Sequence, residues 1–100
     1  MITQMLIRQV RAKILARRGE HAEAERLARE ALGLGEPTDS LEVKANSYRD
    51  LVIVLAAAGK QDEALDALGQ AEALYERKEH RIGVARIREL RSELVATLGT

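Results

Sequence analysis

Side chains capable of catalysis or metal binding are few in this sequence and lie far apart. The two histidines, His21 and His80, stand at expected helix starts, with no histidine or cysteine at metal-ligand spacing. The serines lack the strand-to-helix turn that exposes a nucleophile, and the glycines at 33 and 35 end a helix instead of forming a phosphate loop. We therefore predict that the chain is not an enzyme and holds no cofactor and no metal ion.

The charges balance overall but are separated along the chain. Residues 1–19 contain five basic and no acidic residues, whereas residues 20–80 contain fourteen acids and seven bases. Zero net charge, this acidic middle and an aromatic content of 2% argue against nucleic acid as a partner, because few side chains could stack on bases.

The stretch from residue 48 to 75 predicts two helices joined at Gly59. Residues 51–58 are apolar without interruption, which indicates a helix covered on every side at the middle of the molecule. Gly59 suits the left-handed residue that ends a helix. The helix after it carries one apolar stripe at 3.6-residue spacing, made of Ala64, Leu65, Leu68, Ala71 and Leu74.

The same pattern occurs 40 residues upstream. Gly19 aligns with Gly59, and Leu15-Ala16 and Glu23-Ala24 align with identical residues around the second glycine. The identities fall at the turn and on the stripe of the following helix, where a helical hairpin needs small or apolar side chains. A two-helix unit repeating at a period of about 20–50 residues indicates an α-solenoid.

These residues resemble the tetratricopeptide repeat family. The resemblance is carried by Gly59, Ala64 and Ala71 in one copy and by Gly19, Ala24 and Ala31 in the other, and it covers nearly the whole chain. The spacing of 40 departs from the family period of about 34 and implies longer helices or a longer loop. Arg8 and Arg11 also stand where the family has apolar residues. The wider sequence is similar to the C-terminal repeat tails of large multidomain bacterial regulators.

The resemblance and the helical periodicity together predict an all-α domain of five antiparallel helices over residues 1–100, with about two and a half repeats. The first repeat is expected at about 2–35, the second at about 40–78, and a closing helix at about 81–98. Asp39 or Ser40 is expected to cap the third helix.

A concave groove lined by the first helix of each repeat is what the resemblance implies for function. The chain would then be a non-enzymatic scaffold that binds a protein or a peptide, and basic side chains in the groove would suit an acidic segment or a terminal carboxylate. The groove positions that carry over from the family are Gln9, Lys13, Arg17, Asn46, Arg49, Ile53 and Arg86, with Leu6, Glu89 and Glu93 beside them.

Self-assembly is the alternative function, as a homo-oligomer of a larger regulator or of an engineered repeat chain. The first helix has more apolar residues than one neighbour can cover, and the closing helix has no partner after it. The expected contact residues are Ile2, Met5, Leu6, Val84 and Val95.

A cytoplasmic location without membrane contact is the expectation for the chain. No apolar run approaches the ~20 residues that span a bilayer, and no signal-peptide pattern is present. Residues 2–18 alone would also fit a membrane-surface helix or a targeting peptide, but the repeat continues into them and favours a folded helix.

Overall fold

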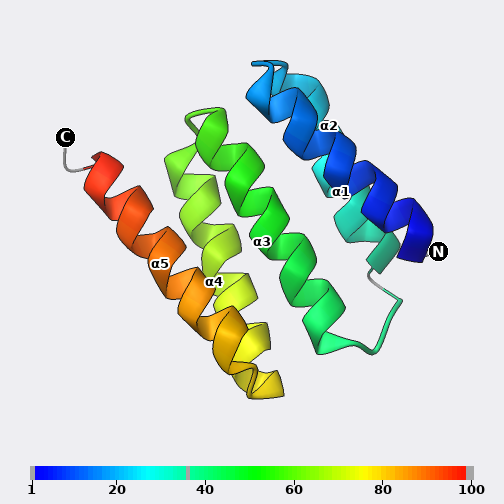
Figure 1. Ribbon diagram of the computed structural model, residues 1–100, viewed down its shortest axis with the longest axis vertical. Helices are drawn as coiled ribbons and strands as arrows, with labels where there is room; N and C mark the ends of the chain where they lie inside the picture. The colour runs from blue at the N-terminus through cyan, green and yellow to red at the C-terminus, as the bar shows by residue number, and fades with distance from the viewer. Residues whose placement is uncertain (1, 36, 99–100) are drawn as a thin grey trace.

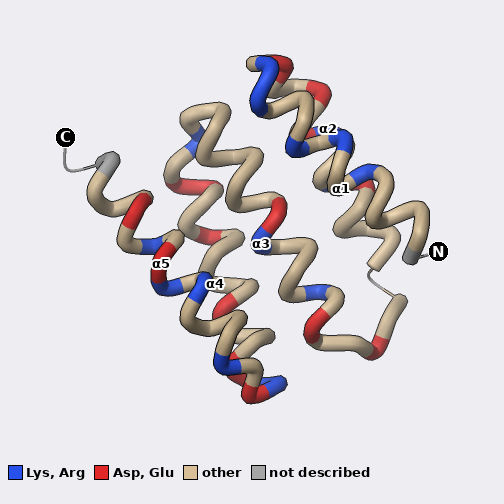
Figure 2. Tube along the Cα trace, in the orientation of Figure 1, with Lys and Arg blue, Asp and Glu red and all other residues tan. Residues whose placement is uncertain are grey.

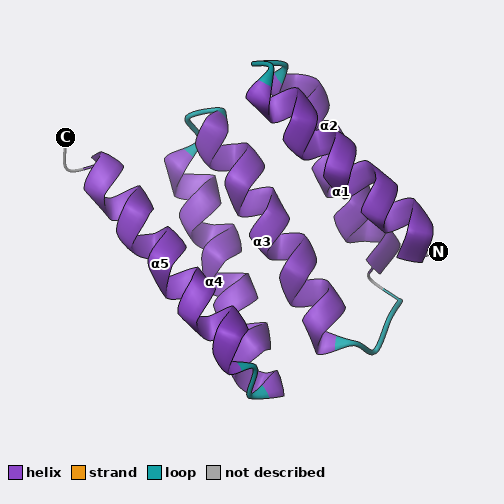
Figure 3. Ribbon diagram, viewed as in Figure 1, coloured by secondary structure: helices purple, strands orange, loops and turns teal. Residues whose placement is uncertain are grey.

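The computed structural model describes residues 2–35 and 37–98, with the side chains of Ile2, Thr97 and Leu98 excepted. These residues form five helices and no strand (Figures 1 and 3), so the all-α prediction is confirmed. The helices are α1 (Ile2–Arg17), α2 (His21–Gly35), α3 (Leu41–Ala57), α4 (Gln61–Lys78) and α5 (Arg81–Leu98).

The helices lie in two layers. Helices α1, α3 and α5 run side by side across the front of Figure 1, while α2 and α4 lie behind them, each antiparallel to the helix before it. The molecule measures 39 × 29 × 17 Å, and the short dimension fits two helices stacked at the usual distance of about 8–10 Å.

The two hairpin turns share one geometry because a glycine occupies the left-handed position in each. Gly19 has a φ of 80° and Gly59 a φ of 78°. The amide of the next residue then reaches back five positions, from Glu20 to the Leu15 carbonyl at 2.9 Å and from Lys60 to the Leu55 carbonyl at 3.0 Å. The repeat read from the sequence is therefore also a repeat of backbone structure.

Helices α3 and α5 begin with equivalent caps, 40 residues apart. The Val43 amide donates to Ser40 Oγ at 3.2 Å, and the Gly83 amide donates to His80 Nδ1 at 2.8 Å. Each cap satisfies a backbone donor that the first helical turn leaves open. His80 is thus a structural residue, and α5 starts in the same register as α3.

Helix α3 lies at the centre, packed against α1, α2 and α4. Leu51, Val52, Val54 and Leu55 are buried, but Ala57 is exposed, so the prediction that this apolar run is covered on every side is wrong. On α4, Leu65 and Leu74 are only partly buried, while Ala67 and Tyr75 join the predicted Ala64, Leu68 and Ala71 in the core. The uncovered side of α3 faces a hollow in the front layer.

Candidate functional site

A hollow of about 490 Å³ opens between the last turns of α1 and α3 and the middle of α5. Its floor is apolar, and charged side chains stand around its rim. The floor is formed by Ala16, Val52, Ile53, Ala56, Ala57, Leu90 and Leu94, and the rim by Lys13, Arg17, Arg86 and Glu93. An apolar concavity with a few charged groups at its edge is the usual form of a binding site.

Four of the seven predicted groove residues line this hollow: Lys13, Arg17, Ile53 and Arg86. Gln9 does not, because its side chain is buried between helices and donates from Nε2 to Ser47 Oγ at 3.0 Å. Gln9 and Asn46 both line a smaller hollow of about 60 Å³, nearer the first turns of α1 and α3.

Asp50 is the residue that sequence reasoning missed. It is only 4% exposed, and its Oδ1 lies 3.5 Å from both Lys13 Nζ and Arg49 Nη2. A buried carboxylate requires such partners, since an unpaired charge would be costly away from water. Two of the cations expected to attract an acidic ligand are therefore already engaged by the fold.

Two further polar groups of the front layer, Asn46 and Arg86, are also paired. Asn46 Oδ1 accepts a hydrogen bond from the Tyr75 hydroxyl, whose pKa is raised by burial. Arg86 lies 3.2 Å from Glu89 and 3.8 Å from Glu93. Among the described residues, Arg17 has no ion-pair partner, so its guanidinium is available to a ligand at the α1 end of the hollow.

A family model described as the tetratricopeptide repeat matches residues 3–77, which takes in nearly all of α1 to α4. The chain belongs to the tetratricopeptide repeat family. Repeats of this family are generally protein–protein interaction modules, so a protein partner is the general expectation for this chain. No curated protein and no solved structure matches the chain.

Longer helices explain how this tetratricopeptide repeat departs from the family period of about 34 residues. The helices contain 15–18 residues each, and the α2–α3 connection adds a loop. Within the described part of the chain, no helix is long and apolar enough to cross a membrane, and no three His, Asp or Glu side chains are grouped as metal ligands.

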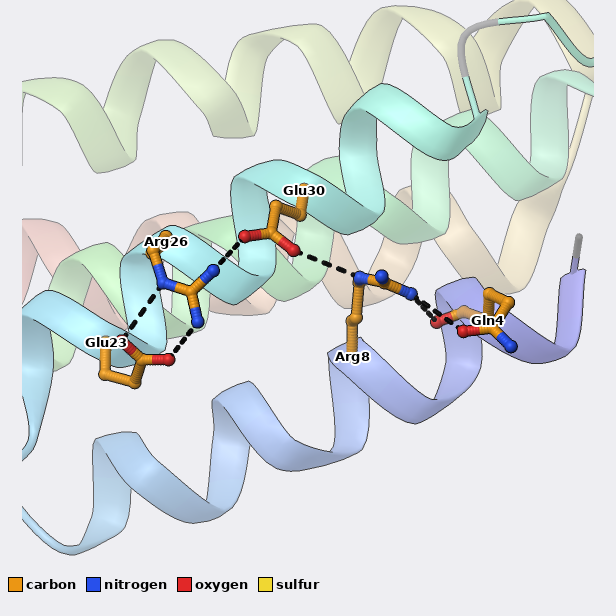
Figure 4. Close-up of polar contacts among 5 residues, drawn as sticks. All are labelled: Gln4, Arg8, Glu23, Arg26 and Glu30. Carbon is orange, nitrogen blue, oxygen red and sulfur yellow. Dashed lines mark hydrogen bonds and ion pairs between the residues drawn. The ribbon is translucent and has the colours of Figure 1, made fainter.

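Arg8, which stands at an apolar position of the family pattern, is accommodated by an ion-pair chain on the α1–α2 surface (Figure 4). Its Nε lies 3.2 Å from Glu30 Oε1, and Nη1 donates to Gln4. Arg26 contacts both Glu30 and Glu23, which lowers the pKa of Glu23 through the hydrogen bond from Arg26. Arg8 therefore makes an ion pair with α2 at a position where the family has an apolar residue.

The residues predicted for self-association differ in how exposed their side chains are. Met5 is buried inside the chain against Gly35, so it is not available for association, and that assignment is wrong. Val84 is partly buried against the core, while Leu6 and Val95 are exposed on α1 and α5. The side chain of Ile2 lies outside the described residues. Self-assembly itself stays a prediction.

Proposed function

We propose that this domain binds a segment of a partner protein in the hollow between α1, α3 and α5. The observation that carries the proposal is the apolar floor open to solvent, since Ala57 and Ile53 keep exposed surface beside the buried Val52, Val54 and Leu55. Exposed apolar surface in a concavity is favourable to cover, at roughly 25 cal/mol per Å² of apolar area.

The charges around the hollow favour one kind of segment. Lys13 is held by Asp50, and Arg86 by Glu89 and Glu93, so the rim is much less basic than the sequence predicts. Figure 2 shows both acidic and basic positions on α5, whereas the charged positions of α1 are all basic. We therefore expect a partner segment with one apolar anchor for the floor and a carboxylate beside it for Arg17.

A displayed library of random peptides, selected on the intact 100-residue chain, tests the proposal. The selected peptides should share an apolar residue next to Asp, Glu or a free carboxyl terminus. Arg17→Glu should weaken their binding by about tenfold or more, because a charge-assisted hydrogen bond is lost and a repulsion added. Ala57→Trp should abolish binding by filling the hollow.

Two matched variants separate binding from general effects. Arg77→Glu makes the same change of charge at an exposed position of α4, outside the residues that line the hollow. Ala73→Trp places the same ring on an exposed position of α4, in the rear layer. Both should bind as the unaltered chain does. If selection enriches no peptides, the hollow is not a binding site. The same conclusion follows if Arg17→Glu and Ala57→Trp leave the affinity for the selected peptides unchanged.

A further inference from the structure

Helix α1 carries an exposed apolar stripe on the side away from α3, at the edge of the solenoid. The stripe consists of Ile7, Val10 and Ile14, which are 47%, 53% and 45% exposed. Their spacing of three and four residues places them on one face of the helix. Three neighbouring aliphatic side chains left half open indicate a surface that a partner covers.

The repeat shows what these three positions do elsewhere in the chain. The matching turns at Gly19 and Gly59 and the matching caps at Ser40 and His80 align α1, α3 and α5 at steps of 40 residues. In α3 the positions equivalent to the stripe are all buried, and so are those in α5. They are Ser47, Asp50 and Val54 in α3, and Ile87, Leu90 and Leu94 in α5.

Each buried set is covered by the preceding hairpin. In α3, Ser47 accepts from Gln9 of α1 and Asp50 pairs with Lys13 of α1, while the helix also packs on α2. In α5, which packs on α4, the same face includes Gly83 against the Tyr75 ring. The stripe on α1 is therefore the equivalent docking face, exposed among the described residues, and it would accept a helix.

The opposite edge of the domain is more polar. The side of α5 that would receive a following helix carries Arg88 and Ser92, where α3 has Tyr48 and Val52, and its apolar Val95, equivalent to Leu55, is 55% exposed. Those polar residues are exposed and can remain in water. The α1 stripe is wholly aliphatic, so among the described residues the larger continuous apolar face lies at this edge.

Charge around the stripe selects the chemistry of that partner. Arg11 lies next to the stripe on α1, and Arg18 directly follows the end of that helix. Neither forms an ion pair with a described residue, and α1 contains no acidic residue. A second copy joined through its own α1 would bring these cations together. The other exposed large apolar side chains of the described residues are Leu6 on α1 and Ile82 and Val95 on α5. Ile82 and Val95 are 13 positions apart, about 20 Å along the helix, so they do not form a second stripe.

We propose that the α1 stripe binds an acidic amphipathic helix of a partner protein, packed as α2 packs on α3. The helix would present one aliphatic stripe to Ile7, Val10 and Ile14, and acidic side chains on its flanks to Arg11 and Arg18. This site is separate from the hollow between α1, α3 and α5, so either proposal can be refuted without affecting the other.

Two designed peptides of about 20 residues, long enough to form a helix, test the proposal. Both carry leucine on one helical stripe, and they differ in having glutamate or lysine on the flanks. Fluorescence anisotropy with the intact chain should show the glutamate peptide binding about tenfold or more tightly than the lysine peptide, with the difference shrinking as salt is added. Val10→Gln should weaken the glutamate peptide by about tenfold, because the centre of the apolar contact is lost.

Val95→Gln is the matched control, since Val95 is 55% exposed and lies on α5. Val95→Gln should change the affinity for the glutamate peptide by no more than about twofold. Ala57→Trp, which fills the hollow, should also leave this affinity unchanged. The proposal is overturned if both peptides bind equally, if neither binds, or if the two glutamine variants behave alike. It is also overturned, in favour of a second copy, if the unaltered chain sediments as a dimer that Val10→Gln dissociates.

Discussion

Tyr75 joins three parts of the molecule through one side chain. Its ring is fully buried and packs against Gly83 of α5. The ring centroid lies 5.3 Å from the centroid of the His80 ring, and the hydroxyl donates a hydrogen bond to Asn46 of α3. A buried hydroxyl needs this acceptor, because an unpaired polar group inside the protein costs about 1–3 kcal/mol. The same burial raises the pKa of Tyr75 above its ordinary value of 10.0.

We predict that Tyr75→Phe lowers the free energy of unfolding by about 1 kcal/mol at pH 7, since Asn46 loses its donor. A raised folded-state pKa gives stability that is present below pH 10.0 and is lost as the pH rises through the folded value. Urea unfolding between pH 7 and 11 should therefore show a shallower alkaline loss in Tyr75→Phe than in the unaltered chain.

Tyr48→Phe provides the control for this experiment. It removes the same hydroxyl from the partly buried tyrosine of α3, which makes no hydrogen bond with the described residues. Lys60, whose pKa is raised by the hydrogen bond to Glu25, should contribute an alkaline loss common to all three proteins. Identical pH profiles for the two tyrosine variants would refute the role given to Tyr75.

Which side chains line the hollow was predictable only where the position in the repeat determines the direction of the side chain. Lys13, Arg17, Ile53 and Arg86 line the hollow as their positions predict. The burial of Asp50 was not predictable, because its partner Lys13 lies 37 residues away and no local pattern links them. A lone acid immediately before an apolar run was the one available signal, since a buried carboxylate needs a cation.

At the scale of elements, α5 is held by close approach to α4. A Cβ atom added at Gly83 would lie 2.6 Å from Cε1 and Cγ of the Tyr75 ring, closer than real Cβ atoms approach. The ring cannot swing away easily, because Cγ is near its attachment and the side chain is fully buried. The absence of a side chain at Gly83 is thus what lets α5 pack on α4.

Gly83→Ala should destabilise the domain by about 1–3 kcal/mol, the usual cost of overpacking a core. Gly69→Ala makes the same change in α4, where nothing lies within 4 Å of the added atom. That variant should gain about 0.5–1 kcal/mol, because alanine favours a helix more than glycine does. Thermal unfolding of both variants measures the contrast, and a Gly83→Ala protein as stable as the unaltered chain would contradict the packing.

The helices themselves were predictable because periodic apolar patterns and turn glycines act locally. Gly59 was expected to adopt the left-handed conformation, and it does so with a φ of 78°. Gly83 gave no comparable signal, since its role depends on a ring eight residues before it on another helix. The left-handed turn at Glu79, with a φ of 59°, was also not foreseen, because a non-glycine residue rarely takes that conformation.

At the scale of the whole molecule, the solenoid has a centre and two edges. Helix α3 packs against α1, α2 and α4, whereas α5 packs mainly on α4. In such an array each hairpin is stabilised by its neighbours, so an edge helix can open without disrupting the rest. Local stability should therefore fall from α3 towards both edges.

Native-state hydrogen exchange checks this expectation. The amides of Val52, Val54 and Leu55 should exchange most slowly, and those in the middle of α1 and α5 should exchange faster, because opening an edge helix exposes fewer contacts. Gly83→Ala should then accelerate exchange in α5 while leaving α1 unchanged, since it weakens only the α4–α5 contact. Equal protection in all five helices, or acceleration spread evenly over them, would mean that the domain opens as one cooperative unit. In that case a partner bound at the α1 edge would stabilise the groove as well, so the two sites would be coupled through folding.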